Sequence, residues 1–194
     1  EGRHVAGSIY DFNLTEQRKF NDFAILYRTN AQSRAMEDAL RKRNIPYKIF
    51  GGLSFYQRKE IKDTLAYLRV IINPKDEESL KRIINYPARG IGQTTIDKLV
   101  VGAKEHGLSL FQTAEKSGSL GIGINSGTVN KLEQFVTLIK SFQIFNETAN
   151  AFEIADEVTK KTYIVSDLKK DGTPEGVSKI ENIEELLNGI KDFT

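Results

Sequence analysis

An unbroken apolar run, FAILY at residues 23–27, constrains the fold more than any other feature of the sequence. A strand that is buried on both faces is continuously apolar, whereas a strand with one wet face alternates apolar and polar residues. Asn30 is a candidate N-cap for the next segment, in which residues 31–40 carry apolar side chains at helical spacing. A second short apolar stretch follows at 47–50. The order strand, helix, strand predicts a parallel α/β unit.

Beyond this unit the sequence favours helices. Apolar residues recur at helical spacing within 61–72, 80–84, 94–105, 132–142, 154–158 and 180–190. Residues 117–127 are rich in Gly and Ser and are the best candidate for a hinge. We therefore predict a fold of the α/β class that is predominantly helical, with one domain at residues 1–121 and an all-helical domain at 122–194.

Composition excludes several classes of function. The chain has no cysteine and two histidines, which removes disulfides and thiolate chemistry and makes a histidine-based metal site improbable. The formal net charge is only +2, so any contact with nucleic acid must come from local patches. No apolar run approaches the roughly 20 residues that span a bilayer. We expect a cytosolic protein without membrane contact, and the first residue, Glu1, suggests a segment excised from a longer chain.

Two residues at the end of the predicted buried strand are candidates for binding a ligand. Tyr27 and Arg28 stand where open α/β sheets usually bind ligands, at the carboxyl edge. An arginine there could hold a phosphate bidentately, and the adjacent aromatic ring could stack on a base. The alternative is that Arg28 pairs with a helix carboxylate and that Tyr27 packs at the rim.

A glycine-containing turn at residues 87–95 (PARGIGQTT) is a candidate for gripping DNA backbone. Glycines let the backbone approach a phosphate, Arg89 supplies charge, and the next helix offers its free N–H groups. This is the pattern of a helix-hairpin-helix, and the candidate contacts are Arg89, Gly90, Gly92 and Thr94. The alternative is a tight turn that needs glycine for its backbone conformation.

A second basic, glycine-containing loop at residues 169–179 opens onto a helix. Its candidate phosphate contacts are Gly172, Gly176, Ser178 and Lys179, and the alternative is a solvated loop. The sequence 121–123 (GIG) has no neighbouring positive charge along the chain and is interpreted as part of the hinge. No stretch matches G-x-x-x-x-G-K-[ST], so the chain has no P-loop, and no cluster of ligands predicts a metal site.

Four blocks, taken together, resemble one family. Residues 24–34 (AILYRTNAQSR) resemble helicase motif IV of the UvrD/Rep/PcrA family of superfamily 1. Residues 44–63 and 87–92 resemble the next two family blocks, and residues 180–186 (IENIEEL) resemble the segment after its duplex-gripping loop. The resemblance implies that residues 1–121 form the first part of the second motor lobe, a partial RecA-like (P-loop NTPase-type) fold with short parallel strands. Residues 122–194 would open its helical insert.

The resemblance also implies roles for single residues. Tyr27 would stack near the adenine of ATP, and Arg28 would reach the γ-phosphate as a catalytic residue. The hairpin residues 89–92 would contact DNA backbone, and residues 176–179 would contact duplex DNA. The intact enzyme would use ATP and Mg²⁺, which this chain alone would not bind.

The function implied is that of an ATP-dependent 3′-to-5′ DNA helicase that translocates on single-stranded DNA and unwinds duplex DNA in repair or replication. Its partners would be DNA, the first motor lobe of the same polypeptide and repair proteins, in the cytoplasm at the nucleoid. The isolated chain would be inactive. Two alternatives stay open, namely an ATP-independent helix-hairpin-helix DNA-binding module and the helicase arm of a helicase-nuclease.

Overall fold

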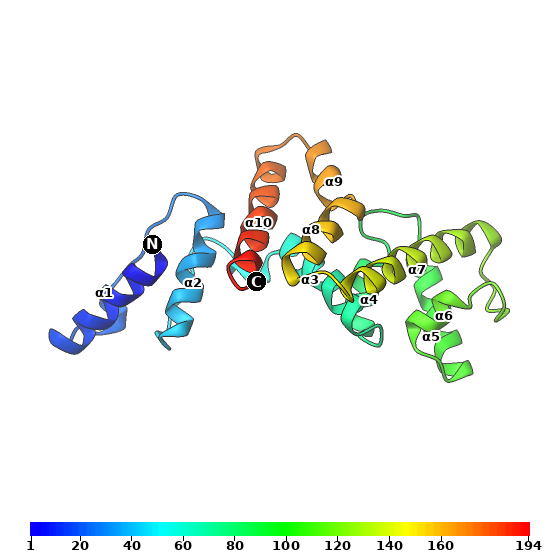
Figure 1. Cartoon of the computed structure of the whole chain (residues 1–194), viewed down its shortest axis with the longest axis horizontal. Helices are drawn as coiled ribbons and strands as arrows, with labels where there is room; N and C mark the ends of the chain where they lie inside the picture. The colour runs from blue at the N-terminus through cyan, green and yellow to red at the C-terminus, as the bar shows by residue number, and fades with distance from the viewer. The chain divides into compact units, whose positions relative to one another are not determined.

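The structure is a computed structural model that describes residues 1–194, except for the side chain of Asn30. That side chain, predicted to be an N-cap, therefore lies outside the description. Helices dominate the chain (Figure 1). In order they are α1 (Gly2–Thr15), η1 (Phe20–Asp22), η2 (Asn30–Gln32), α2 (Ser33–Lys42), η3 (Phe55–Gln57), α3 (Lys59–Ile72), α4 (Glu77–Ile83), α5 (Gln93–His106), α6 (Leu110–Glu115), α7 (Ser126–Asn146), α8 (Ala151–Lys161), α9 (Ile164–Lys170) and α10 (Pro174–Lys191).

The predicted parallel strands are wrong, because the described residues contain no strand. Phe23 has extended dihedral angles, but no ladder of hydrogen bonds forms along residues 23–27 or 47–50 within the described chain. The side chains of Leu26 and Phe50 are 94% and 80% exposed, the opposite of a doubly buried strand. A strand exists only when a neighbour pairs with its backbone, whereas a helix satisfies its backbone locally. The apolar run therefore led to too much predicted burial, and the part of the chain that the structure describes is helical and has no RecA-like sheet.

The chain divides into two compact units, and the first comprises residues 1–62 and 172–186. Here α1 and α2 lie side by side (Figure 1). Their core consists of Ala6, Ile9, Ala39, Leu40 and Ile45. A Cβ built on Gly2 would lie 2.3 Å from the carbonyl oxygen of Ala35, so only glycine permits this approach. The sequence did not predict α1, since few apolar residues mark its buried face.

The second unit comprises residues 63–171 and 187–194. Successive helices pack on one another from α5 to α9, and α4 also packs on α6. Its fully buried side chains include Tyr67, Leu80, Ile83, Leu99, Phe135 and Phe142. The helices predicted around 94–105 and 132–142 are α5 and α7, whereas α6 and α9 were not predicted. The predicted domain boundary at residue 121 falls inside this unit, so the hinge does not coincide with a division between compact units.

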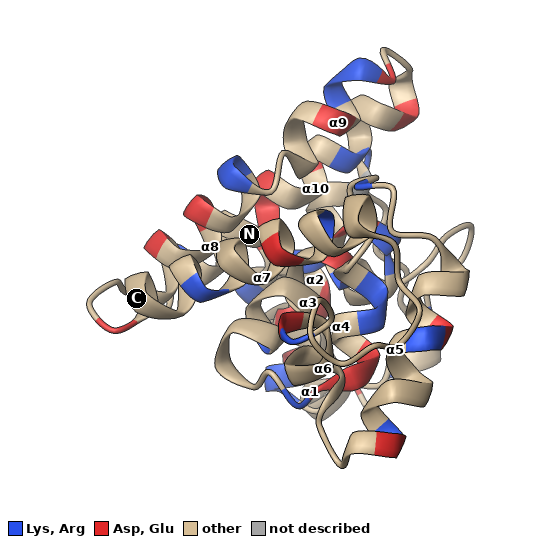
Figure 2. Ribbon diagram, turned by 90° about the vertical axis from the view of Figure 1, so that its right-hand side faces the viewer, with Lys and Arg blue, Asp and Glu red and all other residues tan. Residues whose placement is uncertain are grey.

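Helix ends in the second unit follow capping rules. Asp76 caps α4 by accepting a hydrogen bond from the backbone N–H of Ser79. Asn125 and Asn150 cap α7 and α8 in the same way. Basic and acidic residues are interspersed along the helices (Figure 2), in keeping with the small net charge. Among the described residues, no helix is long and apolar enough to cross a membrane.

Candidate functional site

The first unit contains a cavity of about 930 Å³, a volume typical of small-molecule sites. Residues 23–29 and 46–52, parts of α2, and Ser178 and Glu181 of α10 line it. Its walls combine aromatic and aliphatic side chains with a few polar groups. Tyr27 and Arg28, predicted to bind a ligand, both line this cavity, and so does Ser178 from the second predicted phosphate loop. The structure thus brings together residues that lie about 150 positions apart in sequence.

The turn that carries Arg28 is held by a side chain from η2. The Oε1 atom of Gln32 accepts hydrogen bonds from the backbone N–H groups of Arg28 at 2.9 Å and Thr29 at 3.1 Å. The Arg28 side chain is exposed, and its guanidinium forms no hydrogen bond or ion pair with any described residue. Among the described residues, the structure therefore does not show the alternative in which Arg28 pairs with a helix carboxylate. An arginine in this state can accept an anion without first breaking a protein contact.

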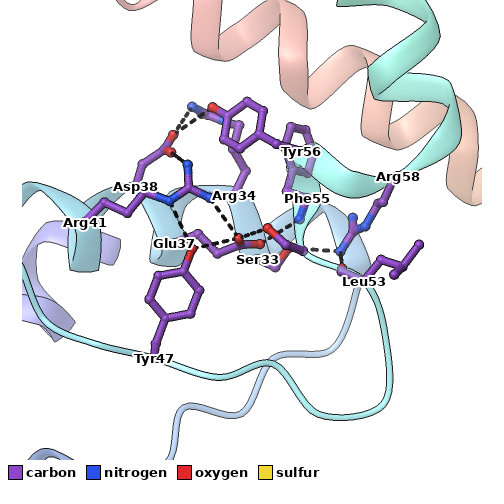
Figure 3. Close-up of polar contacts among 11 residues, drawn as sticks. Ser33, Arg34, Glu37, Asp38, Arg41, Tyr47, Leu53, Phe55, Tyr56 and Arg58 are labelled. Atoms are coloured by element: carbon purple, nitrogen blue, oxygen red, sulfur yellow. Dashed lines mark hydrogen bonds and ion pairs between the residues drawn. The ribbon is translucent and has the colours of Figure 1, made fainter.

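A buried carboxylate fixes the opposite wall of the cavity. Glu37 of α2 is 2% exposed and accepts hydrogen bonds from the hydroxyls of Tyr47 and Ser54 and from the backbone N–H of Phe55 (Figure 3). Arg41 adds an ion pair at 3.3 Å. Burial raises the pKa of Tyr47, and the neighbouring Glu37 charge adds to the rise. These contacts hold residues 47–55 against α2 and so define the shape of the cavity.

Arg58 joins three segments of the first unit. Its Nη2 donates to Ser33 Oγ at 3.0 Å and to the Leu53 carbonyl at 3.5 Å (Figure 3), and its Nη1 donates to Asn182 Oδ1 at 2.8 Å. Asn182 in turn donates to Glu60 Oε1 at 2.7 Å. Burial lowers the pKa of Arg58, although the Glu60 charge opposes this. The guanidinium is thus a structural bridge and not a free cation.

Arg34 makes a second bridge between α2 and α10. Its Nε donates to Glu185 Oε1 at 2.8 Å, and its Nη1 lies 3.3 Å from Asp38 Oδ2. Burial acts to lower the pKa of Arg34, but the hydrogen bond that Arg34 donates to Glu185 and the charges of Glu185 and Asp38 outweigh it, so the pKa is raised. The first half of α10 is therefore tied to α2 by two arginines.

The hairpin between α4 and α5 lies in the second unit. Asn85 Oδ1 accepts hydrogen bonds from the N–H groups of Arg89 at 2.9 Å and Ile91 at 3.0 Å, and Gly90 has a φ of +70°. Gly92 is the N-cap of α5, and both Gly92 and Thr94 are exposed. The exposed backbone of this turn and of the start of α5 is the part of the hairpin that was predicted to contact a phosphate.

The Arg89 side chain, in contrast, points into the protein. Its Nη1 donates to the carbonyls of Ile83, Tyr86 and Pro87, and its Nη2 donates to the Tyr67 hydroxyl. With four protein acceptors, the guanidinium supports the hairpin from within. The predicted DNA contact by Arg89 remains a prediction, and this geometry favours the backbone of the turn over the arginine.

Two lysines that sequence reasoning missed lie beside glycine turns of the second unit. Lys131 Nζ of α7 is 3.4 Å from the Gly90 carbonyl oxygen, and Lys98 Nζ of α5 donates to the Gly123 carbonyl. The turn at residues 121–123 therefore has a neighbouring positive charge in space, which it lacks along the sequence. No local signal could have revealed these pairs, because their members are 41 and 25 positions apart.

The loop that precedes α10 is only partly available to a ligand. Gly172 is exposed with a φ of +62°, whereas Gly176 is buried and its N–H donates to Thr173 Oγ1 at 3.1 Å. Lys179 Nζ lies 2.7 Å from Glu175 Oε1, and this hydrogen bond lowers the pKa of Glu175. A phosphate would have to compete with Glu175 for Lys179.

Comparison with known proteins decides the family. The model of the UvrD-like helicase C-terminal domain matches residues 1–194. The chain belongs to this family. The resemblance read from residues 24–34 is thereby confirmed.

Three curated relatives of this UvrD-like chain are named ATP-dependent DNA helicase PcrA. The chain is 42% identical over 193 residues to the protein of Bacillus subtilis strain 168, with 100% of the chain and 26% of the relative covered. Identity is 41% over 176 residues with that of Staphylococcus aureus strain Mu50 and 41% over 178 residues with that of Staphylococcus epidermidis RP62A, with 91% of the chain and 24% of each relative covered. The chain thus spans about a quarter of the length of these relatives.

The UvrD-like chain contains functional candidates that the motifs alone did not single out. Glu37, Arg58 and Asn182 form the buried polar contacts of the first unit, and Arg58 was noted only as part of a conserved block. The sequence offered no local signal for them, because Glu37 is followed by Asp38 and Arg58 lies between Gln57 and Lys59, although both side chains are less than a tenth exposed. Burial of that kind requires partners, which the sequence could not name.

Proposed function

We propose that the full-length polypeptide containing this chain is an ATP-dependent DNA helicase, and that the cavity of the first unit contributes to binding its nucleotide. The observation that carries the proposal is the Arg28 guanidinium, which lies beside Tyr27 on the cavity and has no partner among the described side chains. Membership in the UvrD-like family supports it, and the B. subtilis relative is named an ATP-dependent DNA helicase.

The residues present fit an adenine nucleotide. Tyr27 offers an aromatic ring for the base, and Arg28 offers a bidentate donor for a phosphate oxygen. During hydrolysis negative charge develops on the transferred phosphoryl group, and a positioned arginine stabilises that charge. Gln32 positions Arg28 by accepting the backbone hydrogen bonds of the turn.

The residues do not fit the Mg²⁺ that such hydrolysis uses. The part of the chain that the structure describes holds no cluster of three acidic or histidine side chains suited to a metal ion. With no P-loop in the sequence, we assign the metal and the triphosphate grip to another part of the polypeptide, the first motor lobe. The isolated chain should therefore not hydrolyse ATP.

For DNA, we propose that the α4–α5 hairpin contacts the phosphate backbone through Gly90, Gly92 and Thr94, with Lys131 as the neighbouring cation. The exposed turn and the free first N–H groups of α5 support this assignment. The start of α10, with Gly172, Gly176, Ser178 and Lys179, is proposed as a weaker second contact. Translocation in the 3′-to-5′ direction, action in repair or replication, repair-protein partners and a cytoplasmic, nucleoid-associated location rest on the family resemblance alone.

The proposal is tested by ATP turnover of the full-length polypeptide in the presence of single-stranded DNA. Arg28→Ala should lower kcat by roughly 10³-fold or more, the effect typical of an arginine that stabilises phosphoryl transfer, while DNA affinity stays within twofold. Arg18→Ala is the matched control, because Arg18 is exposed and pairs only locally with Glu16. Normal turnover by Arg28→Ala would refute the role of Arg28. DNA binding by a polypeptide without ATPase activity would favour the ATP-independent module, and DNA cleavage would favour the helicase-nuclease.

A further inference from the structure

The two predicted sites of the first unit are joined by a continuous series of polar contacts. The first contact is between the turn and η2, where Gln32 Oε1 holds the backbone of Arg28 and Thr29. The next residue, Ser33, begins α2 and accepts from Arg58 Nη2 at 3.0 Å. Arg58 Nη1 then donates to Asn182 of α10 at 2.8 Å. Five residues, Arg28, Gln32, Ser33, Arg58 and Asn182, thus connect the Arg28 turn to α10.

A parallel contact reinforces this path. Arg34, adjacent to Ser33, donates to Glu185 Oε1 of α10 at 2.8 Å. The two side chains are 10% and 23% exposed, so water weakens their attraction only partly. We call Ser33, Arg34, Arg58, Asn182 and Glu185 the α2–α10 clamp.

The first half of α10 also reaches the cavity. Ser178, one turn before Asn182, lines the same cavity as Tyr27 and Arg28. Gly176, Ser178 and Lys179 are the residues of α10 that were predicted to contact DNA. A displacement of α10 by DNA would therefore act on the turn of Arg28 through the clamp and across the cavity.

We propose that the α2–α10 clamp couples DNA contact at the start of α10 to nucleotide binding at Arg28, with Arg34 and Arg58 as positioning residues. This inference rests on the proposed function. Hydrogen bonds of buried and partly buried charged groups permit few arrangements, because breaking them costs free energy, so a clamp of this kind transmits a shift of one helix to the other. By linkage the effect is reciprocal, and ATP binding changes DNA affinity by the same factor.

The test measures a coupling factor in the full-length polypeptide. This factor is the ratio of the Kd values for a non-hydrolysable ATP analogue without and with a saturating oligothymidylate. Glu185→Gln removes the charge that faces Arg34, and Glu184→Gln is the matched control on the exposed face of the same helix. Couplings between sites typically reach 5- to 150-fold. We expect Glu185→Gln to reduce the factor about fivefold or more and Glu184→Gln to leave it unchanged, with the Kd in the absence of DNA within twofold in both.

A second variant guards against a folding defect. Ser33→Ala removes one of the acceptors of Arg58 Nη2 with little change in volume, and it should reduce the same factor while the melting temperature stays close to that of the wild type. Glu185→Asp, which keeps the charge, should restore part of the coupling. Equal coupling factors in the wild type, Glu185→Gln and Ser33→Ala would overturn the inference, as would a wild-type factor of one.

The failure of the clamp is distinguishable from the failure of the proposed function. If the wild type does not bind the ATP analogue, or if Arg28→Ala turns over ATP normally, the proposed function falls and the clamp falls with it. If Arg28→Ala is inactive but the clamp variants couple as the wild type does, only the clamp is refuted.

Discussion

The Nη2 atom of Arg89 donates a hydrogen bond of 2.6 Å to the hydroxyl oxygen of Tyr67. The hydroxyl of Tyr67, which is fully buried, in turn donates a hydrogen bond to the Tyr86 carbonyl. The guanidinium also lies 5.8 Å from the Tyr67 ring centroid and 5.4 Å from that of Phe135. An arginine predicted to face DNA is thus the internal support of the hairpin, and the exposed backbone of the turn is left to meet a phosphate.

Arg89→Ala should lower the free energy of unfolding, because the Pro87 carbonyl loses the donor that Arg89 provides and the Ile83 and Tyr86 carbonyls each lose one of their donors. An unsatisfied buried acceptor costs about 1–3 kcal/mol, so we expect a loss in this range in a urea titration. The control, Arg18→Ala, should change stability by less than about 0.5 kcal/mol. Unchanged stability of Arg89→Ala together with weaker DNA binding would return Arg89 to the role of a DNA contact.

Ionisation of Tyr67 should lower the free energy of unfolding at high pH. Burial raises its pKa to about 12, with the Arg89 charge opposing the rise, whereas a tyrosine in the unfolded chain titrates near about 10. The folded state therefore holds the proton more tightly, and the stabilisation present below pH of about 10 is lost as the pH rises toward 12. Phenolate absorbance should show one tyrosine that titrates later than the others, and Tyr67→Phe should remove it. A uniform titration near the ordinary value would contradict this.

Asp76 should contribute stability that is lost in acid. Hydrogen bonds from the backbone and side chain of Ser79 lower its pKa. The contribution is present above the usual carboxyl pKa of about 3.9 and disappears as the pH falls through the lowered value. In melting curves recorded against pH, Asp76→Ala should lose the most stability at neutral pH, and its difference from the wild type should shrink in acid. Asp76→Asn keeps an acceptor for the cap and serves as the control. A pH-independent difference would argue against the charged cap.

Lys131→Ala should weaken DNA binding by the full-length polypeptide and flatten its salt dependence. One lost phosphate contact lowers the slope of log affinity against log salt by about 0.9 on duplex DNA or about 0.7 on a single strand. Lys140→Ala on the same helix is the control, because Lys140 pairs with Glu115. Identical slopes for the two variants would remove Lys131 from the proposed DNA contact.

Local patterns predicted the helices better than the remainder of the structure. The spacing of Ile61, Leu65 and Leu68 and the acidic residues from Asp76 located α3 and α4, because a helix reports its buried face and its caps within one short segment. The strand predicted at residues 23–27 was wrong because a strand, unlike a helix, depends on pairing partners elsewhere in the chain. The same applies to the site. Arg28 was singled out at the end of a strand that the described residues do not form, and the inward direction of Arg89 depends on Tyr67, 22 positions away.

The most direct measurement of the role of Arg28 is nucleotide discrimination by the full-length polypeptide. Affinities for ADP and for a non-hydrolysable ATP analogue would be compared in the wild type, Arg28→Ala and the control Arg18→Ala. A hydrogen bond to a charged group contributes about 1.5–3 kcal/mol, so loss of a γ-phosphate contact should reduce the preference for the ATP analogue by about tenfold or more. We predict this reduction for Arg28→Ala alone. An unchanged preference in Arg28→Ala would contradict the assignment of Arg28 to the γ-phosphate.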